Sequence, residues 1–152
     1  MIKKILIILS IFFCGTAFAS NTATQKITIK VEAINEISVS GDPEVFLISD
    51  SKTSAADDST TYAMTINETN KKITATIDKE LPKGLTLTVY LDPPEGAVSN
   101  EVALSPKPQD VVSRINPIAA KDMKIHYTLT VDEELPEIAE SSVNVIFTIV
   151  DG

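Results

Sequence analysis

Apolar and polar residues alternate along most of this chain, and this alternation constrains the fold more than any other feature. Successive side chains of a β-strand point to opposite faces of a sheet, so a period of two predicts strands with one apolar face. The apolar members of the stripes are Ile27, Ile29 and Val31; Ile37 and Val39; Tyr62, Met64 and Ile66; Ile73, Ala75 and Ile77; Leu85, Leu87, Val89 and Leu91; Val102 and Leu104; Met123, Ile125, Tyr127, Leu129 and Val131; and Val143, Val145, Phe147 and Ile149. Helical periodicity is nearly absent, so we predict a chain that is nearly all β.

Short segments rich in proline, glycine and asparagine separate these stripes and predict turns. They cover residues 41–43, 67–70, 82–84, 92–96 and 105–108. About eight to ten short strands follow from this spacing, and strands that are apolar on one face are typical of antiparallel sheets. Because two such sheets can bury their apolar faces together, the sequence predicts an antiparallel β-sandwich.

In such a sandwich the apolar phase of each stripe forms the core. The residues most firmly predicted to be buried are Leu87, Val89, Ile125, Tyr127 and Phe147. A short apolar run at 45–48 is expected to add a strand, and the polar segment 49–61 is expected to be a loop. Single helical turns fit the sequence at 117–122 and at 135–140.

The beginning of the chain resembles an export signal. Two lysines precede an apolar run over residues 5–14, and Ala17-Phe18-Ala19 supplies the small residues that signal peptidase requires. Cleavage is therefore expected just before Ser20. The apolar run is shorter than the roughly 20 residues of a membrane span. We predict a signal peptide at 1–19 and one secreted domain at 20–152, with no membrane insertion after cleavage.

The single cysteine, Cys14, lies inside this apolar run. A lipoprotein signal places a small residue before its lipid-bearing cysteine, whereas Phe13 is large, so we expect Cys14 to be discarded with the signal. The mature chain then has no disulfide, although an oxidising compartment would permit one. Its hydrophobic core alone must stabilise it.

The charge balance excludes several partners. The chain has 13 Lys and Arg residues against 21 Asp and Glu residues, a net charge of −8 at pH 7. The loss of the two signal lysines makes the mature chain more acidic. Nucleic-acid binding requires a basic surface, and binding to anionic lipid does too, so neither is expected. Acidity favours solubility outside the cytoplasm, in the periplasm, the medium or at the cell surface.

No set of residues predicts catalysis, a metal or a cofactor. His126 is the single histidine and lies on the polar phase of its stripe, so we interpret it as an exposed strand residue. Zinc sites and catalytic triads need further ligands or a nucleophile beside the histidine. The acidic pairs Asp57-Asp58 and Asp92/Glu95, and the run 132–134, lack the spacing of a calcium loop and are interpreted as solvated acids.

Two further features were considered as binding signals. Asn67-Glu68-Thr69 matches a glycosylation sequon but fits a hairpin turn equally well. A carbohydrate site would need exposed aromatic rings, and the chain has no tryptophan and only 5% aromatic residues. The tyrosines at 62, 90 and 127 are the available candidates for such a site.

Three stretches resemble parts of bacterial fimbrial (pilin-like) subunits, the middle one those of the CS1 type, and the chain also resembles uncharacterised secreted β-sandwich proteins of bacteria. The three stretches are the alternating segment from Thr24 to Ala33, the strand from Lys72 to Asp78, and the last stripe from Ser142 to Gly152. The resemblance implies an immunoglobulin-like β-sandwich in which the N-terminal strand of one subunit completes the next. It also implies other copies of the chain and a periplasmic chaperone as partners, with Ile27, Ile29 and Val31 as strand-donor residues.

Two functional hypotheses therefore remain open. The first is a non-enzymatic structural or adhesive surface protein that assembles by strand addition, in which main-chain hydrogen bonds supply affinity and alternating side chains fill pockets. The alternative is a monomeric periplasmic β-sandwich that binds a ligand or a carbohydrate. A hydrolase that uses a carboxylate pair is the least favoured reading.

Overall fold

The structure is a computed structural model that describes residue 22 and residues 24–49, 53–131 and 140–152. Several sequence predictions lie outside these residues. They concern the signal peptide at 1–19, Cys14, the cleavage site before Ser20, the acidic run 132–134 and most of the helical turn at 135–140.

The described residues form ten β-strands and no helix. In chain order the strands are β1 (Asn35–Ser40), β2 (Ser54–Asp57), β3 (Thr61–Ile66), β4 (Lys71–Ile77), β5 (Leu85–Leu91), β6 (Val98–Ser99), β7 (Val102–Ala103), β8 (Gln109–Ile115), β9 (Ile118–Val131) and β10 (Val145–Asp151). The prediction of a nearly all-β chain with about eight to ten strands is confirmed.

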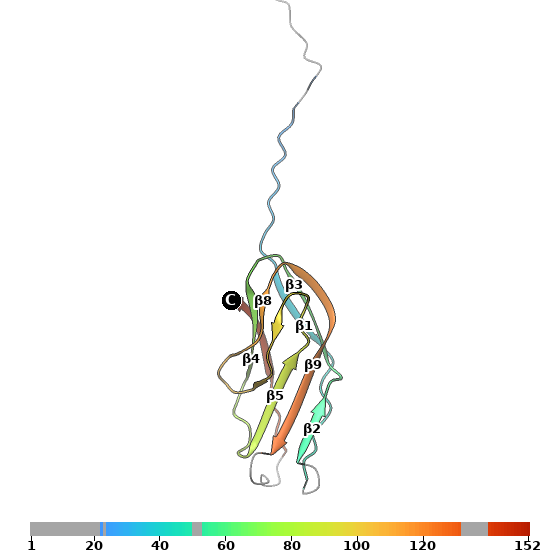
Figure 1. Cartoon of the computed structure of the whole chain (residues 1–152), viewed down its shortest axis with the longest axis vertical. Helices are drawn as coiled ribbons and strands as arrows, with labels where there is room; N and C mark the ends of the chain where they lie inside the picture. The colour runs from blue at the N-terminus through green and yellow to red at the C-terminus, as the bar shows by residue number, and fades with distance from the viewer. Residues whose placement is uncertain (1–21, 23, 50–52, 132–139) are drawn as a thin grey trace, which may run out of the picture. The chain divides into compact units, whose positions relative to one another are not determined.

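The strands form two antiparallel sheets. The six-stranded sheet has the order β1-β3-β9-β5-β7, and β2 pairs with the second half of β9, in line with β3. The four-stranded sheet has the order β10-β4-β8-β6. In Figure 1, β5, β9 and β2 lie side by side along the front of the domain. Both sheets turn their apolar residues inward, which confirms the predicted antiparallel β-sandwich.

The core follows the apolar phases of the stripes. Leu87, Val89, Ile125 and Tyr127 are buried as predicted, with exposed fractions between 0% and 6%. Phe147 is only half-buried, although it packs against the core, so the prediction that it is fully buried is wrong. The reason is its place on β10, the edge strand of the four-stranded sheet.

One internal strand, β8, was not predicted because its alternation is broken twice. Val111 and Val112 are both fully buried, so two successive side chains point inward. Arg114 has a left-handed backbone (φ 60°), and the pairing of β8 with β4 shifts register on both sides of Ile73. Such shifts mark β-bulges, which insert a residue and erase the period of two.

Three other segments differ from expectation. The polar segment 49–61 contains β2, and residues 118–122 begin β9 rather than a helical turn. The apolar run 45–48 forms no strand, although its side chains alternate: Val45 and Leu47 are exposed, whereas Phe46 and Ile48 pack against the core.

The two long sides of the sandwich differ. On one side the chain passes directly from β6, at the edge of one sheet, to β7, at the edge of the other, through two residues. We call this the closed side. On the opposite side, β1 and β10 are the edge strands and lie against each other. We call this the open side, because no such short link joins its two edges.

Candidate assembly interface

The alternating segment 24–31 belongs to none of the ten strands. Ile27, Ile29 and Val31 are 76%, 81% and 75% exposed, and the first strand begins only at Asn35. The prediction that this segment forms a strand is therefore wrong for the chain by itself. Residues 1–31 also separate from residues 32–152 as a unit of their own. The stripe thus has a strand-like sequence but belongs to neither sheet of the described residues.

Strand β10 provides an unprotected sheet edge. From Val143 to Val150 the chain has no charged residue and no proline, the two devices that commonly protect edges. Its inward residues Val145, Phe147 and Ile149 are half-buried, and the outward Ile146 is 46% exposed. An edge strand presents a row of backbone N–H and C=O groups that can pair with another strand. This edge therefore combines free pairing capacity with apolar side chains that are incompletely covered.

The strand order shows which position of the sandwich lies beyond β10. In immunoglobulin domains one sheet has the order A-B-E-D, and the other places F between C and G. The run β1-β3-β9-β5 follows the first order, and the pair β4-β10 corresponds to C and F. A strand beside β10 would therefore hold the G position. Among the described residues, β10 ends its sheet and no strand takes that position.

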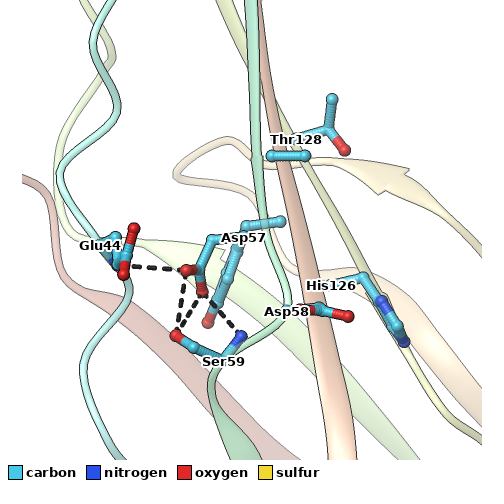
Figure 2. Close-up of a pocket in the computed structure, with 8 residues that line it drawn as sticks. Glu44, Asp57, Asp58, Ser59, His126 and Thr128 are labelled. Carbon is cyan, nitrogen blue, oxygen red and sulfur yellow. Dashed lines mark hydrogen bonds between the residues drawn. The ribbon is translucent and has the colours of Figure 1, made fainter.

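A second feature is a shallow polar pocket at the junction of β2 and β9, shown in Figure 2. Asp57 accepts hydrogen bonds from the backbone N–H of Ser59 (3.2 Å), from its hydroxyl (2.9 Å) and from the N–H of Glu44 (3.3 Å). Asp58 is paired with Lys124 at 3.0 Å, and the lysine lowers the pKa of this carboxyl. These bonds fasten the loop around residue 44 and the end of β2 to β9.

His126 lines the same pocket without forming a catalytic group. Its Nε2 lies 3.0 Å from Oδ1 of Asp92, and its ring makes a tilted contact with Tyr90. The Ser59 hydroxyl bonds to Asp57 and not to the imidazole, so the pocket lacks a nucleophile–base pair. Within residues 24–49, 53–131 and 140–152, no three His, Cys, Asp or Glu side chains converge as a metal site would require.

The tyrosines do not form a stacking surface. Tyr62 and Tyr127 are 1% and 5% exposed, so neither ring is available to a sugar. Burial raises the pKa of both phenols, that of Tyr127 to about 12. The Tyr62 hydroxyl donates to the carbonyl of Asp92, a common arrangement for a buried phenol. Tyr90 is the one tyrosine that remains partly exposed.

The sequence analysis singled out the exposed stripe but not the edge that would receive it. The uncharged stretch 143–150 was visible in the sequence, yet its position at a sheet edge depends on the topology. Also unforeseen was the role of the β3–β4 turn, where Asn67 and Asn70 bind distant backbone groups. The turn itself was predicted.

Comparisons with known proteins add no identification. No family model matches the chain, and neither the curated proteins nor the solved structures contain a significant match. In the part of the chain that the structure describes, there is no helix of the length and hydrophobicity needed to cross a membrane.

Proposed function

We propose that this protein is an exported, non-enzymatic structural or adhesive subunit that assembles by strand addition, as a fimbrial subunit does. The observation that carries the proposal is the coexistence of an exposed alternating stripe and an unprotected apolar sheet edge in one chain. Segment 24–31 of one copy is the donor, and the edge of β10 in a second copy is the acceptor. Each copy then donates one strand and receives one.

The chemistry of the two parts is complementary. Ile27, Ile29 and Val31 recur at every second position, as do the inward residues Val145, Phe147 and Ile149 of β10. A strand on the β10 edge would gain main-chain hydrogen bonds and place its own apolar side chains over these half-buried residues. Full burial of an aliphatic side chain contributes about 1.5–3 kcal/mol, so the three donor residues would add to the affinity that the main-chain hydrogen bonds supply.

The geometry also favours an open chain of copies over a closed pair. The donor and the acceptor are different surfaces, so the contact is heterologous. Heterologous contacts give rings when the rotation between copies closes and filaments when it does not. A periplasmic chaperone that covers the β10 edge before assembly is a second partner that fits the same surface.

A deletion tests the proposal directly. We expect the exported protein to form oligomers larger than dimers on size-exclusion chromatography, and the variant lacking residues 20–31 to be a folded monomer. A synthetic peptide of residues 22–33 should raise the melting temperature of that monomer, because a ligand that binds only the folded state stabilises it. If the intact protein is monomeric, or the deletion leaves its oligomers unchanged, the proposal is wrong.

A pair of point variants supplies the matched control. Ile29→Asp places a charge on the apolar phase of the donor, whereas Thr28→Asp places it on the polar phase one residue earlier. Both residues are exposed, so neither change should alter the folding of the domain. Ile29→Asp should abolish assembly and Thr28→Asp should preserve it. Equal effects would show that charge, and not strand addition, controls the association.

The alternative, a monomeric ligand-binding or carbohydrate-binding module, has the polar pocket of Figure 2 as its best site. We place it second because the carboxylate of Asp57 is already bonded within the protein and two of the three tyrosines are buried. A monomeric wild-type protein that binds a sugar, and loses that binding on His126→Ala, would favour this alternative.

A further inference from the structure

The β3–β4 turn holds the chain at the point where strand β1 is about to begin. The backbone N–H of Asn67 donates to the carbonyl of Ile34 at 3.1 Å. The side chain of the same asparagine then makes two more bonds. Its Oδ1 accepts from the N–H of Ile34 at 2.7 Å, and its Nδ2 donates to the carbonyl of Glu32 at 2.7 Å. One residue therefore fixes the backbone from Glu32 to Ile34.

These bonds continue the β1–β3 ladder after β3 itself has ended. The last regular pair is Asn35 with Ile66, and the chain turns away at Asn67. A carboxamide carries the same donor and acceptor as a peptide group, so the Asn67 side chain takes the place of the next peptide of β3. The ladder thus reaches Glu32, the first residue of the folded unit 32–152. The exposed segment begins one residue earlier.

The same turn also holds the end of β10. Asn70 accepts a hydrogen bond at its carbonyl from the N–H of Gly152 (2.8 Å), and its Nδ2 donates to the Gly152 carbonyl (3.2 Å). A Cβ atom at residue 152 would lie 2.7 Å from the Asn70 carbonyl oxygen, so this approach requires glycine. Lys71 pairs with Asp151 at 2.6 Å, and this bond raises the pKa of the lysine and lowers that of the carboxyl.

We propose that Asn67 is a positioning residue that fixes where the donor segment leaves the folded domain, and so sets the tether between consecutive copies in the assembly. This inference rests on the proposed function. Since the turn binds Glu32 on one side and the end of β10 on the other, it links the base of the donor strand to the acceptor strand of the same copy. Without the Asn67 side chain, the Glu32 carbonyl and the Ile34 N–H lose these two bonds, while the Asn67 N–H still binds the Ile34 carbonyl. The exposed segment then lengthens by up to two residues, about 7 Å in extended form.

Hydrogen exchange tests whether the Asn67 side chain holds residues 32–34 in solution. Asn67→Ala removes both side-chain bonds, whereas Asn67→Asp keeps an acceptor for the Ile34 N–H at neutral pH. Loss of a bond of ordinary strength changes an opening equilibrium about tenfold, so we expect about tenfold faster exchange at Ile34 in the alanine variant and near-native exchange in the aspartate variant. Asn100→Ala, at an exposed residue beside β6, is the matched control. Native protection of Ile34 in Asn67→Ala would overturn the proposal.

Electron microscopy of the assemblies tests the positioning role itself. We expect Asn67→Ala assemblies to bend more easily and to have an axial repeat longer by up to about 7 Å, while those of Asn100→Ala match the wild type. A merely stabilising role would lower the melting temperature but leave the repeat unchanged, and that result would overturn the proposal. If the wild type forms no assemblies, the proposed function fails first. If the wild type assembles and the Asn67→Ala assemblies have the same repeat, the positioning role of Asn67 is wrong but the proposed function stands.

Discussion

The strands one position in from the closed side and the edge strand β10 of the open side are similarly apolar but are buried to different degrees. Val89 on β5 and Val111 and Val112 on β8 lie one strand in from the closed side and are fully buried, whereas Val98 on its edge strand β6 is 43% exposed. On the open side, Val145, Phe147 and Ile149 remain half-buried although their stripe alternates as regularly. Apolar patterning therefore does not decide burial by itself. A strand also needs a hydrogen-bonded partner at each edge, and β10 pairs with a strand on one side only, since it contacts β1 without pairing with it.

The difference has a direct functional meaning. Edges of natural sheets are commonly protected by charges, prolines or a covering segment. The edges of the closed side are the two-residue strands β6 and β7, and such short edge strands offer little backbone for pairing, whereas β10 has no charge from Val143 to Val150. The open side retains unused apolar surface and unused backbone pairing capacity, and the same chain contains an exposed stripe that could use both. Substitutions at the centre of the core and at the two edges, taken from the largest expected effect on the stability of the single domain to the smallest, test this difference.

The largest effect is expected from the centre of the core. Ile125 lies on β9 and is 0% exposed, so Ile125→Ala removes buried methyl and methylene groups and leaves a cavity. Such truncations cost about 2–5 kcal/mol. Urea unfolding of the monomeric variant that lacks residues 20–31 measures the cost without contributions from assembly. A loss below about 1 kcal/mol would mean that the core is packed differently from this structure.

Phe147→Ala is the corresponding truncation on the open side. A fully buried phenylalanine costs about 3–5 kcal/mol to truncate, but Phe147 is only half-buried in the single domain, so we expect roughly half that loss. Bound donor peptide should cover the ring, so the cost should rise when the same variants are compared in the presence of peptide 22–33. An equal cost with and without peptide would show that the donor does not lie over Phe147.

These two variants also show how far the sequence predicts the structure. The stripe of Ile125 predicted its burial correctly because β9 is an internal strand, where the apolar phase always faces the core. The stripe of Phe147 looks the same in the sequence, yet its burial depends on which strand lies beside it. Strand β8 was missed because Val111 and Val112 are adjacent at a bulge. Local patterning predicts strands and faces, whereas edges and bulges follow from pairing between distant segments.

The candidate interface, too, could be predicted from the sequence only in part. Ile27, Ile29 and Val31 were singled out from their alternation, although the structure places them in no strand. The acceptor edge could not be predicted, because the order of strands in a sheet is not encoded in the alternation of any one strand. The hydrogen bonds of Asn67 could not be predicted from the sequence either, since they join it to Glu32 and Ile34, more than thirty positions away.

A smaller effect is expected from acidification, and it should reach the open side first. Hydrogen bonds from Asn144 lower the pKa of Asp78, and Lys71 lowers that of Asp151, so carboxylates fasten both ends of β10. A lowered native pKa gives stability that is complete above the ordinary value of 3.8 and is lost as the pH falls through the native value. Protection from hydrogen exchange, measured relative to the intrinsic rate at each pH, should therefore fall in β10 before it does in β5 as the pH is lowered. If β10 and β5 lose their protection from hydrogen exchange at the same pH, this order is wrong.

The smallest effect on the single domain is expected from a charge placed on an exposed edge residue, and this variant separates stability from assembly. Ile146 on β10 and Val98 on β6 are similarly exposed, at 46% and 43%, and lie at the two edges of the same sheet. Ile146→Lys and Val98→Lys should each change the free energy of unfolding by no more than about 0.5 kcal/mol, as exposed substitutions usually do. Lysine on an edge strand opposes pairing with another strand. Ile146→Lys should therefore prevent assembly on size-exclusion chromatography, whereas Val98→Lys should leave it intact. If both variants assemble normally, the incoming strand does not use the β10 edge. If both fail, the closed side is an interface as well, and the two sides differ less than their burial indicates.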